Sequence, residues 1–93
     1  MADIRKTQNH NIERDALRSR LEELAGEMHE KFGIKSRWDG DVCHLSGSAL
    51  KNGTLTMTAS SVTIELNLAL MAKMIKGQIE KEIDKRLLRV LES

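Results

Sequence analysis

The sequence lacks proline and tyrosine, and its 93 residues include one tryptophan, one phenylalanine and one cysteine. A lone cysteine cannot close a disulfide within the chain, so the fold is expected to rest on one modest apolar core. Proteins that bind single-stranded nucleic acid stack the bases on several exposed aromatic rings. The shortage of rings therefore argues against a nucleic-acid partner.

An excess of one charge and long apolar segments are missing as well. The 15 basic residues nearly balance the 14 acidic ones, for a net charge of +1, so the whole chain has no strong attraction to nucleic acid or anionic lipid. No apolar run approaches the ~20 residues of a membrane-spanning helix, and the first ten residues do not resemble a secretory signal. These features predict a single soluble, cytoplasmic domain over residues 1–93.

Residues 53–68 predict a β-hairpin with a two-residue turn at Ser60-Ser61. Apolar residues alternate along both arms, and pairing Ala59 with Val62 gathers them on one face of the ladder. The predicted apolar face consists of Leu55, Met57, Ala59, Val62, Ile64, Leu66 and Leu68. The opposite face carries mainly threonines.

Residues 34–46 predict a second hairpin, because Asp39-Gly40 is a strong signal for a two-residue turn. Pairing Trp38 with Asp41 places one set of residues, Ile34, Cys43 and Leu45, on the apolar side. The other side then carries Lys35, Arg37, Val42 and His44. In the connection after this hairpin, Leu50 is expected to turn toward the core, and residues 52–53 suit a turn or a bulge.

Apolar residues recur every three or four positions from residue 12 to residue 32, which predicts an amphipathic helix. Either Asn9 or Asn11 is expected to cap its start, and Gly33 suits a left-handed cap at its end. Gly26 lies within the helix, at a cost of about 1 kcal/mol relative to alanine. We interpret it as a point of close crossing with another element.

A short strand around Ile4 is expected before this helix, at an edge of the sheet, because Lys6 breaks its apolar alternation. A last helix is predicted from about residue 71 to residue 91. Its apolar stripe is Met71, Met74 or Ile75, Ile79, Ile83, Leu87, Val90 and Leu91.

This order of elements predicts an α+β fold. Each strand pair has one apolar and one polar face, which calls for helices on one side of the sheet only. We predict a two-layer sandwich in which an antiparallel sheet of three to five strands, in β-α-β-β-β-β-α order, carries two long helices on one face. Its polar face is open to water or to a partner.

The order and spacing of several short motifs resemble one protein family, the putative polyhydroxyalkanoic acid system proteins. The motifs are Asp3-Ile4-Arg5, His10, the segment from Ala16 to Leu24, Lys31-Phe32-Gly33-Ile34, Arg37-Trp38-Asp39-Gly40-Asp41, His44-Leu45 and Lys76-Gly77. The chain departs from the family pattern at Lys6 and at Ser48-Ala49-Leu50. The resemblance implies a small proteobacterial protein that is encoded near polyester granule genes and has its place at the granule or in its regulation. It implies no reaction and brings no catalytic residues.

The residues suited to chemistry are scattered. His10, His29 and His44 do not have the spacing of a metal site, and no second cysteine joins them. Cys43 is expected to be buried, and its neighbour His44 should point to the opposite face. We predict no metal, no cofactor and no enzymatic activity.

Five residues form the predicted partner surface: Trp38, Arg37, His44, Met71 and Met74. Trp38 is expected to close the core, with anchoring of a partner as the alternative. The polar sheet face, with Lys35, Arg37, His44, Thr54, Thr56 and Glu65, is expected to be solvated rather than a docking surface. The methionines are expected to fill the core rather than form an apolar binding patch.

Three functions follow from these expectations. The first is a non-enzymatic accessory protein that contacts the polyester granule or a protein on it, for which an exposed apolar patch is required. The second is a homodimeric interaction module unrelated to granules, paired through a sheet edge. The third, an enzyme or small-ligand carrier, would need a polar pocket between sheet and helices, and the predicted inner face offers almost no polar groups for one.

Overall fold

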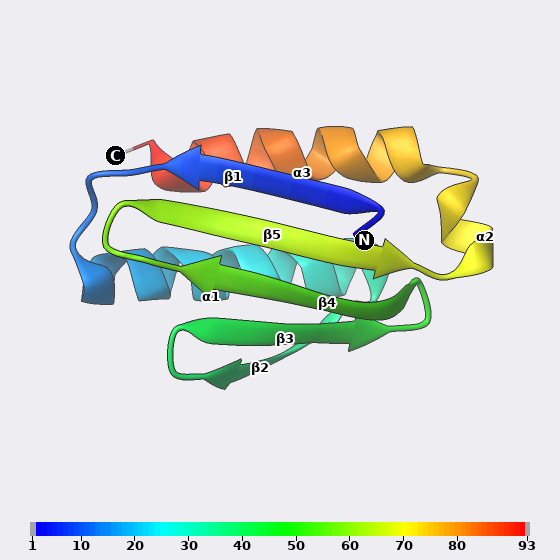
Figure 1. The fold of residues 1–93 in the computed structure, drawn as a ribbon, viewed down its shortest axis with the longest axis horizontal. Helices are drawn as coiled ribbons and strands as arrows, with labels where there is room; N and C mark the ends of the chain where they lie inside the picture. Colours follow the sequence, from blue (N-terminus) through cyan, green and yellow to red (C-terminus); the bar gives the residue numbers. More distant parts are fainter. Residues whose placement is uncertain (1, 93) are drawn as a thin grey trace.

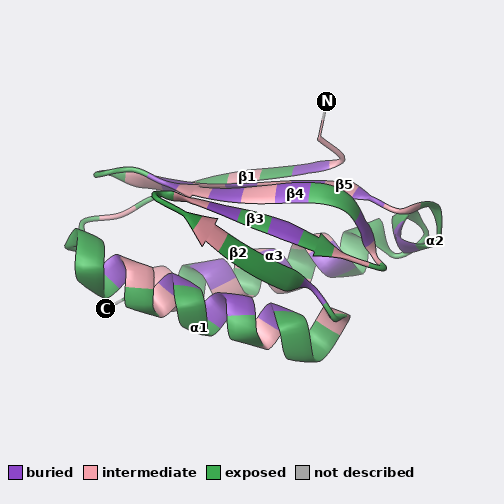
Figure 2. Ribbon diagram, turned by 90° about the horizontal axis from the view of Figure 1, so that it is seen from below, coloured by how far each residue is buried: buried purple, intermediate pink, exposed green. Residues whose placement is uncertain are grey.

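Five antiparallel strands form one sheet in the order β1-β5-β4-β3-β2, and the helices cover one of its faces (Figures 1 and 2). The computed structural model describes residues 2–92. Its elements are β1 (Ile4–Asn9), α1 (Arg14–Phe32), β2 (Lys35–Asp39), β3 (Val42–Gly47), β4 (Leu50–Met57), β5 (Ser61–Leu68), α2 (Leu70–Lys73) and α3 (Lys76–Leu91). The predicted α+β sandwich with two long helices on one face is confirmed.

The core lies between the sheet and the two long helices. Along β5, every second residue is buried, and its neighbours are half-exposed on the open face. Helices α1 and α3 contribute the other half of the core with Leu17, Leu21, Leu24, Met28, Ile79, Ile83 and Leu87. Leu50 is turned inward as predicted, and the ladder between β4 and β5 has a bulge between Leu50 and Asn52.

The turn of the β4–β5 hairpin lies one residue earlier than predicted, at Ala59-Ser60. The Thr58 hydroxyl accepts hydrogen bonds from the backbone N–H groups of Ser60 and Ser61, at 3.2 and 3.0 Å, and so fixes the turn locally. The predicted pairing of Ala59 with Val62 was therefore wrong, and Ala59 is exposed. Because the register moved by two residues, the residues that remain in the ladder lie on their predicted faces.

The β2–β3 turn lies one residue later than predicted, at Gly40-Asp41. A turn of type I′ at Asp39-Gly40 needs positive φ at both residues, but among residues 2–92 only glycines have positive φ, and Gly40 has φ +62°. The turn therefore uses Gly40-Asp41, and Trp38 pairs with Cys43 instead of Asp41. The inward positions of this hairpin were again predicted correctly.

Helix α1 is capped by Glu13, so the expected cap at Asn9 or Asn11 was wrong. The Glu13 carboxylate accepts hydrogen bonds from the backbone of Asp15 and Ala16, at 3.1 and 3.3 Å. Asn9 already belongs to β1, which leaves it on the sheet. The left-handed cap at the C-terminal end of α1 is confirmed, with φ +68°.

Two glycines contrast in their surroundings. A Cβ at Gly26 would meet no other atom within 4 Å, so the predicted close crossing there was wrong. At Gly53 an added Cβ would lie 2.7 Å from Leu66 Cδ2 and 3.1 Å from the Glu65 carbonyl oxygen. Close approaches between elements occur instead at Gly53, between neighbouring strands, and at Gly47, where an added Cβ would lie 2.8 Å from the Gly33 carbonyl oxygen.

The last helix is interrupted, which places its first turn differently from the prediction. Helix α2 ends at Lys73 and α3 begins at Lys76. The interruption turns α2 so that Ala72 packs inward. Met71 and Met74 are then 82% and 87% exposed, so the prediction that they fill the core was wrong.

Strand β1 is an edge strand, as predicted. The charge of Lys6, on the side of β1 that faces the helices, is tolerated because it is paired. Its ammonium lies 3.2 Å from both Glu80 and Asp84 of α3. Hydrogen bonds to Asp84 and Glu80 raise the pKa of Lys6. The charge therefore ties the sheet edge to the helix layer.

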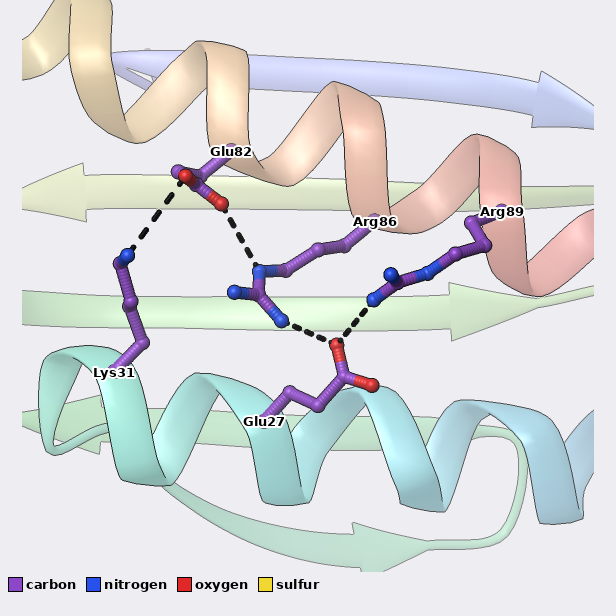
Figure 3. Close-up of polar contacts among 5 residues, drawn as sticks. All are labelled: Glu27, Lys31, Glu82, Arg86 and Arg89. Carbon is purple, nitrogen blue, oxygen red and sulfur yellow. Dashed lines mark hydrogen bonds and ion pairs between the residues drawn. The ribbon is translucent and has the colours of Figure 1, made fainter.

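Helices α1 and α3 are joined by a polar group of residues, here named the interhelical network: Glu27, Lys31, Glu82, Arg86 and Arg89 (Figure 3). The Arg86 guanidinium pairs with Glu27 of α1 and with Glu82 one turn earlier in α3, the latter at 3.1 Å. Arg89 also reaches Glu27, at 3.1 Å. The network links the middle and the C-terminal half of α3 to the C-terminal half of α1.

Candidate functional site

Four of the most exposed apolar side chains gather in α2 and the turn after it. Leu70, Met71, Met74 and Ile75, here named the apolar tip, are 79%, 82%, 87% and 46% exposed. Helix α2 lies beyond the C-terminal end of β5, at one end of the molecule (Figure 1). Monomeric proteins rarely expose large apolar residues in such contiguous groups without a binding role.

The backbone around the apolar tip is fixed by local hydrogen bonds. Ala69 N–H donates to the Ala49 carbonyl at 2.9 Å, and the Ala69 carbonyl accepts from Ala72 and Lys73 at 3.0 and 3.2 Å. Positions 70 and 74, like 71 and 75, are four residues apart and lie on the same side of a helical turn. The tip is thus exposed by an ordered backbone whose one inward side chain is Ala72.

Lys73 and Lys76 lie within and just after the chain segment of the apolar tip, and the Asp3 carboxylate lies 4.0 Å from the Lys73 ammonium. A hydrogen bond from the Leu68 N–H, at 2.8 Å, lowers the pKa of the Asp3 carboxyl, and the charges of Lys73, Lys76 and Lys51 lower it further. The chain contains no acidic residue from position 66 to position 79. The end of the molecule that carries the tip is therefore locally basic although the whole chain is nearly neutral.

A hollow of about 540 Å³ lies between the C-terminal end of α1 and the first half of α3, and we name it the basic hollow. Its lining residues are Lys31, Phe32, Ile75, Gln78, Lys81, Glu82 and Lys85. Ile75 belongs to both the hollow and the apolar tip. The two features therefore form one continuous surface, apolar at the end of the molecule and basic beside it.

The structure divides the predicted partner surface. Met71 and Met74 lie in the apolar tip. Arg37 and His44 face each other across β2 and β3 on the open face of the sheet, and both are exposed. Trp38 lies on the helix side of the β2 edge, half-buried against the core, with the Arg18 guanidinium 4.1 Å from its ring centroid. The five residues do not form one surface.

The residues suited to chemistry have structural surroundings. Cys43 is fully buried, and this burial raises the pKa of its thiol, while His44 is exposed on the other face of the strand. His10 links the start of α1 to the β4–β5 turn: its Nδ1 accepts from Ile12 N–H, and its Nε2 donates to the Thr58 carbonyl, both at 3.0 Å. Within residues 2–92, no three histidine, cysteine or carboxylate side chains are grouped to hold a metal ion.

Reasoning from the sequence found the methionines of the tip but missed Leu70, Ile75 and the lysines around them. The available signal was the absence of acidic residues from position 66 to position 79, in a chain that is otherwise rich in them. No helix in the described part of the chain is both long and apolar enough to cross a membrane.

Comparison with known proteins gives one match. Residues 4–91 match the model of a family described as putative polyhydroxyalkanoic acid system protein. Neither the curated proteins nor the solved structures contain a match to the chain.

Proposed function

Because the chain belongs to the putative polyhydroxyalkanoic acid system protein family, we propose that it is a non-enzymatic accessory protein that attaches to polyester storage granules in the cytoplasm. The apolar tip is the part that makes the contact. The observation that carries this proposal is the exposure of Leu70, Met71 and Met74, each close to four-fifths or more.

The energetics of the tip favour transfer to an apolar surface. Covering a large apolar side chain contributes roughly 1.5–3 kcal/mol, and the tip offers four of them within residues 70–75. Methionine is unbranched and flexible, so Met71 and Met74 can adapt to a surface without fixed shape. A polyester or a protein on the granule surface would supply such a partner.

The same proposal includes that the protein has no enzymatic activity. The helix-facing side of the sheet is apolar, and the Cys43 thiol is buried in it. Cys43 and its neighbour His44 point to opposite faces of the sheet, so they cannot act together. Among residues 2–92 no polar or charged residue is buried, so the interior that the structure describes offers no convergent polar groups for a substrate. Surface contact is the mode of action that these features support.

Sedimentation with isolated polyester granules tests the proposal. The double variant Met71→Ser, Met74→Ser should lower the bound fraction about tenfold or more, because it removes two of the four apolar contacts. Val42→Ser is the control, since Val42 is a half-exposed apolar residue on the open sheet face. Equal granule binding by the double variant and the wild type would refute attachment through the tip.

Homodimerisation through β2 is a second candidate function, favoured by the charge pattern of that edge strand. In an antiparallel pairing of β2 with a second copy, with the two-fold axis at Trp38, Arg37 of each chain lies opposite Asp39 of the other. Opposite charges in cross-strand pairs stabilise such a ladder, and symmetry forms each pair twice. The half-exposed Trp38 side chains would meet beside the axis.

Charge exchange distinguishes this dimer from other contacts. Analytical ultracentrifugation should show that Asp39→Arg weakens association, because like charges then face each other. The double variant Arg37→Asp, Asp39→Arg should restore it. A wild-type chain that is monomeric at the highest attainable concentration would exclude the β2 dimer.

A further inference from the structure

We propose that the basic hollow binds the phosphate of anionic phospholipids, so that the chain attaches to a lipid-coated surface rather than to bare polymer. This inference rests on the proposed docking role of the apolar tip and names the chemistry beside it. It concerns Lys31 of α1 and Lys81 and Lys85 of α3, which line the hollow.

The cations of the hollow exceed its anions. Lys31, Lys81 and Lys85 line it together with a single carboxylate, Glu82. That carboxylate is engaged by the Arg86 guanidinium at 3.1 Å, while Lys31 lies 3.9 Å away from it (Figure 3). Among the residues that the structure describes, Lys81 and Lys85 have no carboxylate within ion-pair distance, and both are exposed. Their charges are available to a ligand.

The spacing of these groups suits one anion. Gln78, Lys81 and Lys85 follow each other at three and four residues along α3, which places them on one side of the helix. Two lysines four residues apart repel each other, and an anion bound between them converts this repulsion into attraction. The amide of Gln78 adds a neutral hydrogen-bond donor on the same side. A phosphate, with several acceptor oxygens, can use all three groups.

The apolar part of the hollow indicates that the anion carries an apolar chain. Phe32 and Ile75 line the hollow beside the lysines, and Ile75 continues into the apolar tip. A phospholipid whose phosphate is held by Lys81 and Lys85 therefore directs its acyl chains toward Ile75 and the tip. Apolar residues bordered by lysines are the arrangement by which proteins lie at the interface of anionic lipids. A free phosphate would use only the basic half of this surface.

Vesicle flotation tests the inference. Wild-type chain should float with vesicles of phosphatidylcholine containing about one third phosphatidylglycerol and bind at least about tenfold less to phosphatidylcholine alone. Removing two cations from the hollow with Lys81→Gln, Lys85→Gln should lower binding about 10- to 30-fold. The matched control is Arg5→Gln, Lys35→Gln, which removes two exposed cations from the open sheet face and should bind like the wild type. Unchanged circular dichroism spectra would show that all variants are folded.

Every outcome separates this inference from the proposed function. If the hollow variant and the control bind equally well, the hollow is not the lipid site. If wild-type chain binds polyester particles but not the anionic vesicles, the inference fails and granule attachment by the tip stands. If calorimetry shows that inorganic phosphate binds the wild-type chain at the hollow while the anionic vesicles do not bind it, the site is one for free phosphate, and the lipid assignment is overturned. If Met71→Ser, Met74→Ser still binds the vesicles fully, the tip is not part of the lipid contact.

Discussion

The open face of the sheet and the apolar tip are both exposed to water, but their side chains are satisfied differently. On the open face, polar residues of neighbouring strands bind each other: Arg5 to Glu65 at 3.1 Å, Thr7 to Thr63 at 3.0 Å and Asn67 to Asn52 at 2.7 Å. In the tip, four apolar side chains project from a fixed backbone and contact little of the molecule. The contrast shows that exposure alone does not identify a binding surface. Exposed apolar side chains that are grouped together are the better indicator.

The largest effect is expected when a carboxylate is placed on the buried face of the sheet, and the same charge on the open face is the comparison. Ile64→Asp should unfold the domain, because it buries an unpaired carboxylate at a position that is 2% exposed. Thr56→Asp, on the open face of the neighbouring strand, should change the free energy of unfolding by only about 0.5 kcal/mol. Urea denaturation measures both. A folded Ile64→Asp variant would show that the two faces are reversed.

Methionine replacement sharpens the difference between the tip and the core. Met57→Ala should lower the free energy of unfolding by about 2–5 kcal/mol, because Met57 is 3% exposed within the core. Met71→Ala should change it by less than about 0.5 kcal/mol. Thermal denaturation of the two variants makes the comparison. A large loss of stability in Met71→Ala would mean that the tip is part of the core rather than a docking element.

Two glycines test how closely the sheet is packed. Gly53→Ala should destabilise the domain by roughly 1–3 kcal/mol, since its Cβ would lie 2.7 Å from Leu66 Cδ2. Gly26→Ala should stabilise it by about 1 kcal/mol, since the new methyl group meets nothing and the helix gains propensity. Chemical denaturation decides the signs. A stabilising Gly53→Ala would show that β4 and β5 have room that the structure does not give them.

The smallest effect is expected from acid, and it concerns the helix layer rather than either exposed surface. The hydrogen bond from Arg86 lowers the pKa of Glu82 from its usual 4.5. Stability from this pair is therefore complete above pH 4.5 and is lost as the pH falls through the lower value of the folded state. The melting temperatures of wild type and Glu82→Gln should differ at neutral pH and converge in acid. A constant difference would exclude this linkage.

The faces of the sheet could be predicted from the sequence because strand alternation has a period of two. Both hairpin registers were wrong by two residues, at Ala59-Ser60 and at Gly40-Asp41, yet a shift of two leaves each side chain on its face. The position of the β4–β5 turn depended on the Thr58 hydroxyl, and that of the β2–β3 turn on the positive φ of Gly40. Neither is visible in the apolar pattern.

The apolar tip could not be predicted, because its pattern fits a different structure equally well. Met71, Ile75, Ile79 and Ile83 have the four-residue spacing of a continuous helix, and no proline marks the interruption between α2 and α3. Which of these residues face the core depends on how α2 is seated by Ala72. The long-range pairs of the interhelical network are likewise invisible to local pattern.

The two-layer construction has a consequence for a molecule attached by its tip and basic hollow. The hollow lies between α1 and α3, which cover one side of the sheet, and the tip lies on α2 beyond the end of β5 (Figures 1 and 2). The other side, with Arg37 and His44, then faces the solution. A molecule attached in this way would bind a surface through its helices and leave the polar face of the sheet free for a second contact.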